Sequence, residues 1–74
     1  MNINVKLIGL LQQDRFKQME RTYPTGTRVQ EVIADLKLPQ LHIGILLING
    51  VHADAEAILS EGDKLVVLPL LGGG

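Results

Sequence analysis

The sequence has no cysteine and no tryptophan, and its only aromatic residues are Phe16 and Tyr23. Without thiols the chain can form neither a disulfide nor a thiolate zinc site, and it has no cysteine nucleophile. Any sulfur chemistry would therefore have to use a group other than a thiol side chain. With so few aromatic rings, the core must be built from Leu, Ile and Val, since 46% of the 74 residues are hydrophobic.

Two further absences narrow the class of protein. The formal net charge is −1, so no basic excess favours nucleic acid as a partner. No apolar run approaches the length of a membrane span, and the polar–apolar alternation at the N-terminus is unlike a signal or transit peptide. Because a small domain without disulfides fits a reducing compartment, we expect one cytoplasmic domain that binds neither membrane nor nucleic acid.

The first third of the sequence predicts two antiparallel strands. Ile3, Val5 and Leu7 alternate with polar residues, which is the pattern of a half-buried strand. Residues 9–14 read as a turn or loose connection, and residues 15–23 as the second strand, which Pro24 ends.

A helix follows this pair of strands. Thr27 is the expected N-cap, and Gln30 three residues later would complete a capping box. Apolar residues then recur at i, i+3, i+4 and i+7, which places them on one side of a helix that ends before Pro39. These residues are Val29, Val32, Ile33 and Leu36.

The second half predicts three strands separated by turns. Residues 43–48 form a continuous apolar run, which reads as a central strand buried on much of both faces. Asn49-Gly50 predicts a tight turn into a short return strand over residues 51–54. A turn at residues 60–63, which Asp63 would stabilise, precedes the last strand at residues 64–68. The order of elements predicts an α+β fold, with a mixed sheet of four or five strands packed on one main helix.

The last strand should leave apolar side chains uncovered. Its side chains alternate, so Leu65 and Val67 point one way while Val66 and Leu68 point the other. One helix covers only one face of a sheet, and an apolar patch on the other face favours a protein partner. We predict as partner-binding residues Val66, Leu68, Leu70 and Leu71.

The sequence finishes with Gly72-Gly73-Gly74. Glycine has no Cβ, so such a segment can pass through a narrow channel and present its carboxylate to an enzyme. The five residues beyond Pro69 reach up to about 17 Å when extended. We therefore expect a folded domain over residues 1–71 and a flexible tail over residues 72–74.

Three segments resemble the MoaD/ThiS family of ubiquitin-like sulfur carriers: residues 48–50 (Ile-Asn-Gly), residues 59–65 (Leu-Ser-Glu-Gly-Asp-Lys-Leu) and residues 68–74 (Leu-Pro-Leu-Leu-Gly-Gly-Gly). Members of this family typically show an Asn-Gly turn, a Leu-x-x-Gly-Asp turn and a terminal Gly-Gly. The small subunit of molybdopterin synthase is the closer likeness, because of the position of Pro69 and the longer first hairpin. The resemblance implies the ubiquitin-like β-grasp fold.

The resemblance also implies a chemistry for the tail. An adenylating enzyme related to ubiquitin activators would use ATP and magnesium to activate the carboxylate of Gly74, and a sulfur source would convert it to a thiocarboxylate. The large subunit of molybdopterin synthase would then receive the sulfur for molybdenum or tungsten cofactors. The chain itself would be a carrier and not an enzyme, with no bound cofactor or metal.

Alternative functions remain open at this point. Within the same chemistry, the carrier could serve thiazole synthase in thiamin biosynthesis. A ubiquitin-like modifier would instead join its tail to lysines of target proteins, and a plain β-grasp interaction domain would leave the tail idle. His42 and His52 lack metal-binding spacing, so we interpret them as solvated or hydrogen-bonded side chains.

Overall fold

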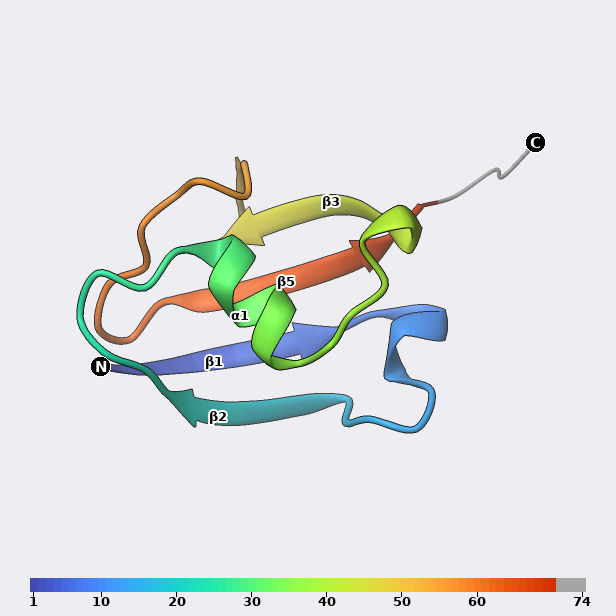
Figure 1. The fold of residues 1–74 in the computed structure, drawn as a ribbon, viewed down its shortest axis with the longest axis horizontal. Coiled ribbons are helices and arrows are strands. Elements are labelled where there is room, and N and C mark those ends of the chain that lie inside the picture. The colour runs from blue at the N-terminus through green and yellow to red at the C-terminus, as the bar shows by residue number, and fades with distance from the viewer. Residues whose placement is uncertain (71–74) are drawn as a thin grey trace.

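The computed structural model describes residues 1–70. Within them, five strands form one mixed sheet, and α1 (Val29–Asp35) lies across one of its faces (Figure 1). The strands are β1 (Asn2–Leu7), β2 (Gln18–Thr22), β3 (Ile43–Ile48), β4 (Val51–Ala53) and β5 (Lys64–Pro69). Two 3₁₀ helices are η1 (Gly9–Gln12) and η2 (Gln40–His42). The predicted α+β arrangement is confirmed.

The first and the last strand lie side by side inside the sheet. The strand order is β2-β1-β5-β3-β4, and β1 runs parallel to β5 with Val5 opposite Leu65. The other neighbouring pairs are antiparallel. The middle position therefore belongs to β5 and not to β3, which corrects the prediction made from the apolar run of residues 43–48.

The core lies between α1 and the covered face of the sheet. Leu65 and Val67 of β5 have no exposed surface, as the alternation predicts. They belong to one cluster with buried residues of β1 and α1. The cluster includes Ile3, Val5, Leu7, Val29, Val32 and Ile33.

Strand β3 is much less buried than its sequence suggests. Leu46 is its one buried residue, and Ile45 is 44% exposed. The physical reason is that α1 covers only one face of the sheet, so every second side chain of β3 faces away from the core. The prediction of burial on both faces is wrong.

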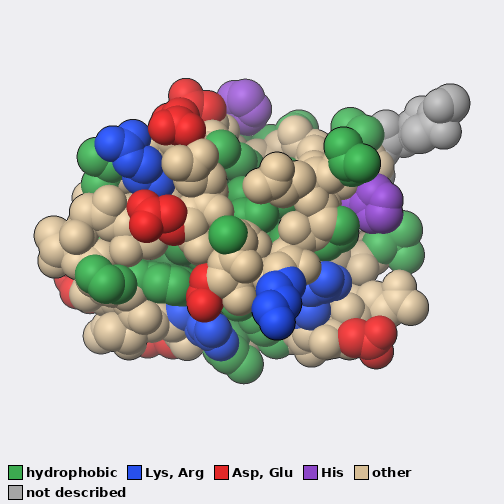
Figure 2. Space-filling view, in the orientation of Figure 1, with side chains coloured by type: hydrophobic (Ala, Val, Ile, Leu, Met, Phe, Trp, Pro, Cys, Tyr) green, Lys and Arg blue, Asp and Glu red, His purple; other side chains and the backbone are tan. Residues whose placement is uncertain are grey.

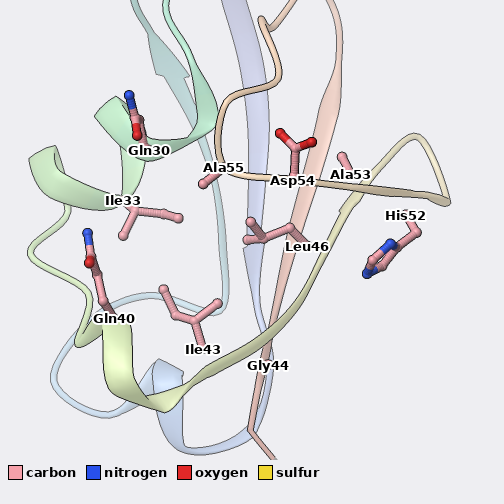
Figure 3. A pocket seen from close by; sticks show the side chains of 10 residues that line it. All are labelled: Gln30, Ile33, Gln40, Ile43, Gly44, Leu46, His52, Ala53, Asp54 and Ala55. Carbon is pink, nitrogen blue, oxygen red and sulfur yellow. The ribbon is translucent and has the colours of Figure 1, made fainter.

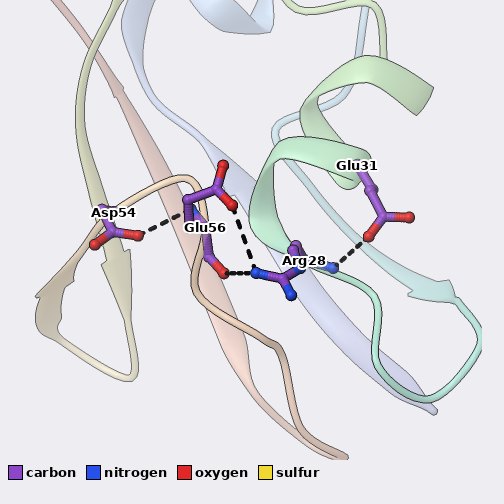
Figure 4. Close-up of polar contacts among 4 residues, drawn as sticks. All are labelled: Arg28, Glu31, Asp54 and Glu56. Atoms are coloured by element: carbon purple, nitrogen blue, oxygen red, sulfur yellow. Dashed lines mark hydrogen bonds and ion pairs between the residues drawn. The ribbon is translucent and has the colours of Figure 1, made fainter.

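The start of α1 also differs from the sequence pattern. Arg28 is the N-cap, and its backbone N–H donates to the Glu31 carboxylate at 3.0 Å. Thr27 lies one residue before the N-cap, and its hydroxyl donates to the carbonyl of Pro24 at 2.7 Å. The Arg28 guanidinium also contacts Glu56, with a donor–acceptor distance of 3.2 Å to its carbonyl and an ion pair of 3.5 Å (Figure 4). These contacts join the helix to the segment that follows β4.

The connection after β1 is ordered rather than loose. Leu11 of η1 is buried in the core, and the Gln12 side chain donates to the carbonyl of Leu7 at 2.9 Å. Strand β2 accordingly begins at Gln18, later than the predicted residue 15.

Candidate functional site

Four apolar side chains gather on the face of the sheet opposite α1. Val66 and Leu68 alternate with the buried residues of β5, so they point away from the helix. In the antiparallel register with β3, Leu47 lies opposite Val66, and Ile45 lies opposite Leu68. We call these four residues the apolar face. Among residues 1–70 no helix covers it.

The apolar face has a basic residue on one side and a histidine on the other. Lys6 lies beside Val66 in the β1–β5 register, and His52 lies opposite Leu47 in the β3–β4 register. Cross-strand neighbours of this kind share a face of the sheet. The apolar face is therefore two strands wide and lies between a lysine and a histidine side chain.

The chain leaves the sheet beside η1 and η2. The backbone N–H of Leu70 donates to the carbonyl of His42 at 2.7 Å, and the Leu70 side chain is 60% exposed. An apolar hollow of about 230 Å³ adjoins it, lined by Leu10, Leu11, Pro39, Leu41, His42, Pro69 and Leu70. Hydrophobic side chains are visible at this end of the molecule (Figure 2). We call Pro69 and Leu70 the tail root.

The predicted partner-binding residues thus fall into two groups. Val66 and Leu68 belong to the apolar face, whereas Leu70 lines the hollow at the tail root. Leu71 and the predicted reactive segment, Gly72, Gly73 and Gly74, lie outside the described residues.

Sequence reasoning missed several members of both groups. Ile45 and Leu47 were hidden in an apolar run that reads as core. Leu10 and Leu41 are 80% and 89% exposed, and both are in short 3₁₀ helices that carry no apolar periodicity. The only feature of the sequence that could have indicated Leu10 and Leu41 is that each is a leucine within a segment that otherwise reads as a turn.

The residues of the predicted turns hold each other in place. The Asn49 side chain donates to Asp63 Oδ1 at 2.9 Å and accepts from the backbone N–H of Lys64 at 2.9 Å. The other Asp63 oxygen accepts from the backbone N–H of Ser60 at 2.7 Å, so Asp63 stabilises its own turn, as predicted. Asn49 and Gly50 both have positive φ, 53° and 82°, as a tight two-residue hairpin turn requires. The turn motifs therefore fix the start of β5.

A polar cluster joins the end of β2 to the end of α1. The Tyr23 hydroxyl and the Arg21 guanidinium both donate to Asp35 Oδ2, at 2.9 Å and 3.2 Å. The hydrogen bond from Tyr23, with that from Arg21, lowers the pKa of Asp35. Partial burial, with the hydrogen bond to Asp35, raises the pKa of Tyr23. The cluster contacts neither the apolar face nor the tail root, so it stabilises the fold rather than forming a reactive site.

A groove of about 410 Å³ lies between α1, β3 and β4 (Figure 3). Ile33, Ile43 and Leu46 form its apolar part, and Figure 3 shows the ring of His52 on the other side of β3 from them. Asp54 at the rim accepts the backbone N–H of Glu56 at 2.8 Å, so this carboxylate is used in a turn. Within residues 1–70, no three His, Cys, Asp or Glu side chains are grouped to hold a metal ion. In the same residues, no helix is long and apolar enough to cross a bilayer.

One α-helix on a five-stranded mixed sheet, with parallel first and last strands inside it, defines a ubiquitin-like β-grasp protein. The chain belongs to the ThiS family, whose model matches residues 5–74. This confirms the resemblance to the MoaD/ThiS sulfur carriers, whose members are small carrier subunits rather than catalysts.

Solved structures of the same fold cover nearly the whole chain. SAMP1 from Haloferax volcanii is 20% identical over 100% of both chains, with a TM-score of 0.77. A putative molybdopterin converting factor, subunit 1, from Pyrococcus furiosus is 21% identical over 96% of this chain and 99% of its own, with a TM-score of 0.78. The complex of subunits 1 and 2 of molybdopterin-converting factor from Helicobacter pylori contains a chain 18% identical over 100% of both, with a TM-score of 0.70. No curated protein matches by sequence. At these identities the likeness shows the fold.

Proposed function

We propose that the protein is a sulfur carrier for molybdopterin-type cofactor assembly, and that its reactive group is the carboxylate of Gly74. The observation that supports this most is the family match through residue 74, on a chain whose last strand carries an apolar face. Gly72 and Gly73 would let the chain enter a narrow active site, because they add no side chain.

The proposed reaction has two steps. A carboxylate oxygen of Gly74 attacks the α-phosphorus of ATP, and the bond between the α- and β-phosphates breaks to release pyrophosphate. Hydrosulfide then attacks the acyl carbon, a C–S bond forms, and AMP leaves with the carboxylate oxygen. ATP and magnesium belong to the adenylating partner, so the carrier is a cosubstrate without a cofactor of its own. A cysteine-free carrier of this kind suits the reducing cytoplasm.

The apolar face is the proposed contact with both partners. The four residues Ile45, Leu47, Val66 and Leu68 would pack against the adenylating enzyme first and the large synthase subunit afterwards. The Helicobacter pylori structure, a complex of two subunits of molybdopterin-converting factor, supports a large-subunit partner. Leu70 and Leu71 would add contacts where the tail enters the partner.

Two other uses of the same activated carboxylate remain candidates. SAMP1 is a small archaeal modifier protein, and its structural likeness favours a modifier that joins Gly74 to lysines. The ThiS family match keeps thiazole synthase as a possible sulfur acceptor. The molybdopterin assignment is preferred because of Pro69, the longer first hairpin and the two structural relatives named for molybdopterin conversion.

Intact mass spectrometry tests the proposal directly. The protein is incubated with ATP, magnesium, sulfide and a matching adenylating enzyme whose activity has been demonstrated. We expect a mass gain equal to replacing one oxygen by sulfur, and a variant lacking Gly74 should show none. Absence of the gain in the wild-type protein would overturn the sulfur-carrier proposal. Adding the large synthase subunit with precursor pterin, thiazole synthase or lysine-bearing target proteins then identifies the acceptor.

A further inference from the structure

The tail root and the end of β5 are held by the segment just before β3 and the residue just after β1. On one side, the backbone N–H of Leu70 donates to the carbonyl of His42 at 2.7 Å. On the other side, the backbone N–H of Ile8 donates to the carbonyl of Val67 at 3.1 Å, just before Pro69. The position of the tail root is therefore set by η2, which precedes β3, and by Ile8, which follows β1.

Gly44 lies against this point at unusually short range. A Cβ atom on Gly44 would lie 2.8 Å from the carbonyl oxygen of Pro69, 2.9 Å from Leu70 Cα and 3.1 Å from Leu70 N. Real Cβ atoms essentially never show contacts under 3.0 Å. All three neighbours are backbone atoms, so no side-chain rotation relieves the overlap.

The local strand geometry explains the close approach. The β3–β5 register shifts between Ile43 and Ile45, which places Gly44 in a bulge. Bulges bend a strand and redirect the chain beside it. Gly9 approaches the tail root from the opposite side, but a Cβ there would meet Pro69 Cγ at an ordinary 3.4 Å. An added Cβ would therefore overlap with backbone atoms of the tail root at Gly44, but it would make only an ordinary contact at Gly9.

We propose that Gly44 is a positioning residue that sets where, and in which direction, the reactive tail leaves the fold. The inference rests on the proposed function, because it concerns delivery of the Gly74 carboxylate. Four residues beyond Leu70 span at most about 14 Å, so a tail extended in a channel has little slack. If the tail root moves by about 1 Å, the carboxylate of Gly74 is misplaced in the active site of the partner. Misplacement on that scale can lower the rate about 100-fold.

The test measures kcat and KM for the carrier as substrate of the adenylating enzyme, by pyrophosphate exchange. For Gly44→Ala we expect kcat to fall by about 10- to 100-fold, with KM nearly unchanged because the apolar face is intact. Inserting one glycine after Leu71 should restore most of the kcat, since the longer tail absorbs the displacement. A merely destabilised protein would not be rescued by a longer tail.

Gly50→Ala is the matched control. It lies at the other end of β3, has a φ of 82°, and has no neighbour within 4 Å of an added Cβ. It should lower the melting temperature through backbone strain while leaving kcat unchanged. If Gly44→Ala does not fold, Leu70→Pro decides the question, because it removes the hydrogen bond to His42 without adding a Cβ at Gly44. It should show the same loss of kcat and the same rescue, whereas KM rises because the Leu70 side chain proposed to contact the partner is also lost.

The outcomes separate the two proposals. Wild-type kcat in a folded Gly44→Ala protein, or a loss that the inserted glycine does not restore, would overturn the positioning role alone. A wild-type protein that supports no pyrophosphate exchange with an active enzyme would overturn the proposed function, and the positioning role with it.

Discussion

Asn49 and Asp63 join two turns that are far apart in the sequence, through a side-chain hydrogen bond of 2.9 Å. One turn connects β3 to β4, and the other leads into β5. The Asn-Gly and Gly-Asp motifs that resemble the family pattern are thus one structural unit. Its effect is to hold the start of the strand whose other end carries the tail.

Asn49→Ala should therefore destabilise the protein by about 1–2 kcal/mol. The variant loses two hydrogen bonds and places a Cβ residue at a φ of 53°. Urea unfolding measures the loss. Asn49→Gly is the control, because glycine accepts this φ, so its smaller loss isolates the hydrogen bonds. Equal stability of Asn49→Ala and the wild type would contradict the structural role.

The contact between Asp35 and Tyr23 predicts a loss of stability in acid. The folded-state pKa of Asp35 lies below its ordinary value of 3.8. Its stabilising effect is therefore complete above that value and is lost as the pH falls through the lower, folded-state pKa. Asp35→Asn should flatten the stability profile below about pH 4, whereas Glu20→Gln, which alters an exposed carboxylate on β2, should not. Identical profiles for the two variants would refute this.

The stability of the protein at alkaline pH should depend on Tyr23. Its folded-state pKa lies above the ordinary value of 10.0, so the unfolded chain ionises first as the pH rises. The stabilising effect is present below pH 10 and is lost as the pH rises through the folded-state pKa. Tyr23→Phe should cost about 0.5–1.5 kcal/mol at pH 7 and weaken the alkaline loss. The unfolding midpoints of the wild type and of Tyr23→Phe in urea, measured at neutral and at alkaline pH, check both effects.

The strands and the helix were predictable because burial of one face imposes a period on the sequence. Residues 3–7 alternate between apolar and polar side chains, and α1 has its apolar stripe, since both elements pack against the same core. The run in β3 was misread because an apolar residue that faces a partner looks the same in sequence as one that faces the core.

The site was only partly predictable for a different reason. Val66 and Leu68 follow from alternation within one strand, but Ile45 and Leu47 join them only through the β3–β5 register. The demand for glycine at position 44 comes from Pro69 and Leu70, which approach it only after the whole sheet has formed. Contacts between residues so far apart leave no local pattern in one sequence.

Val66→Asp should weaken binding to the adenylating enzyme by about tenfold or more, because it places a charge in the centre of the apolar face. Val51→Asp is the matched control: Val51 is 68% exposed and lies on β4, outside the apolar face. Isothermal titration gives both affinities, and thermal melting confirms that each variant is folded. Equal affinities would rule out the apolar face as the contact.

Gly73→Val should abolish adenylation without changing stability. The residue lies outside the described part of the chain, so this prediction rests on the proposed entry of the tail into a narrow channel. A branched side chain would block that channel, and Gly73→Ala should have a smaller effect. Pyrophosphate exchange measures both variants. Full activity of Gly73→Val would contradict the proposed entry of the tail into a narrow channel.

The position of β5 between β1 and β3 also bears on how the protein is made. The first strand cannot pair with its parallel neighbour until residues 64–67 have been synthesised, so the fold has many contacts between the two ends of the chain. A growing or broken chain that stops before residue 64 leaves the centre of the sheet empty. Such contacts form slowly, after the intervening chain has been ordered. A native apolar face therefore exists only on molecules that already contain β5, the strand that leads to the tail. A partner that recognises this face does not bind incomplete chains.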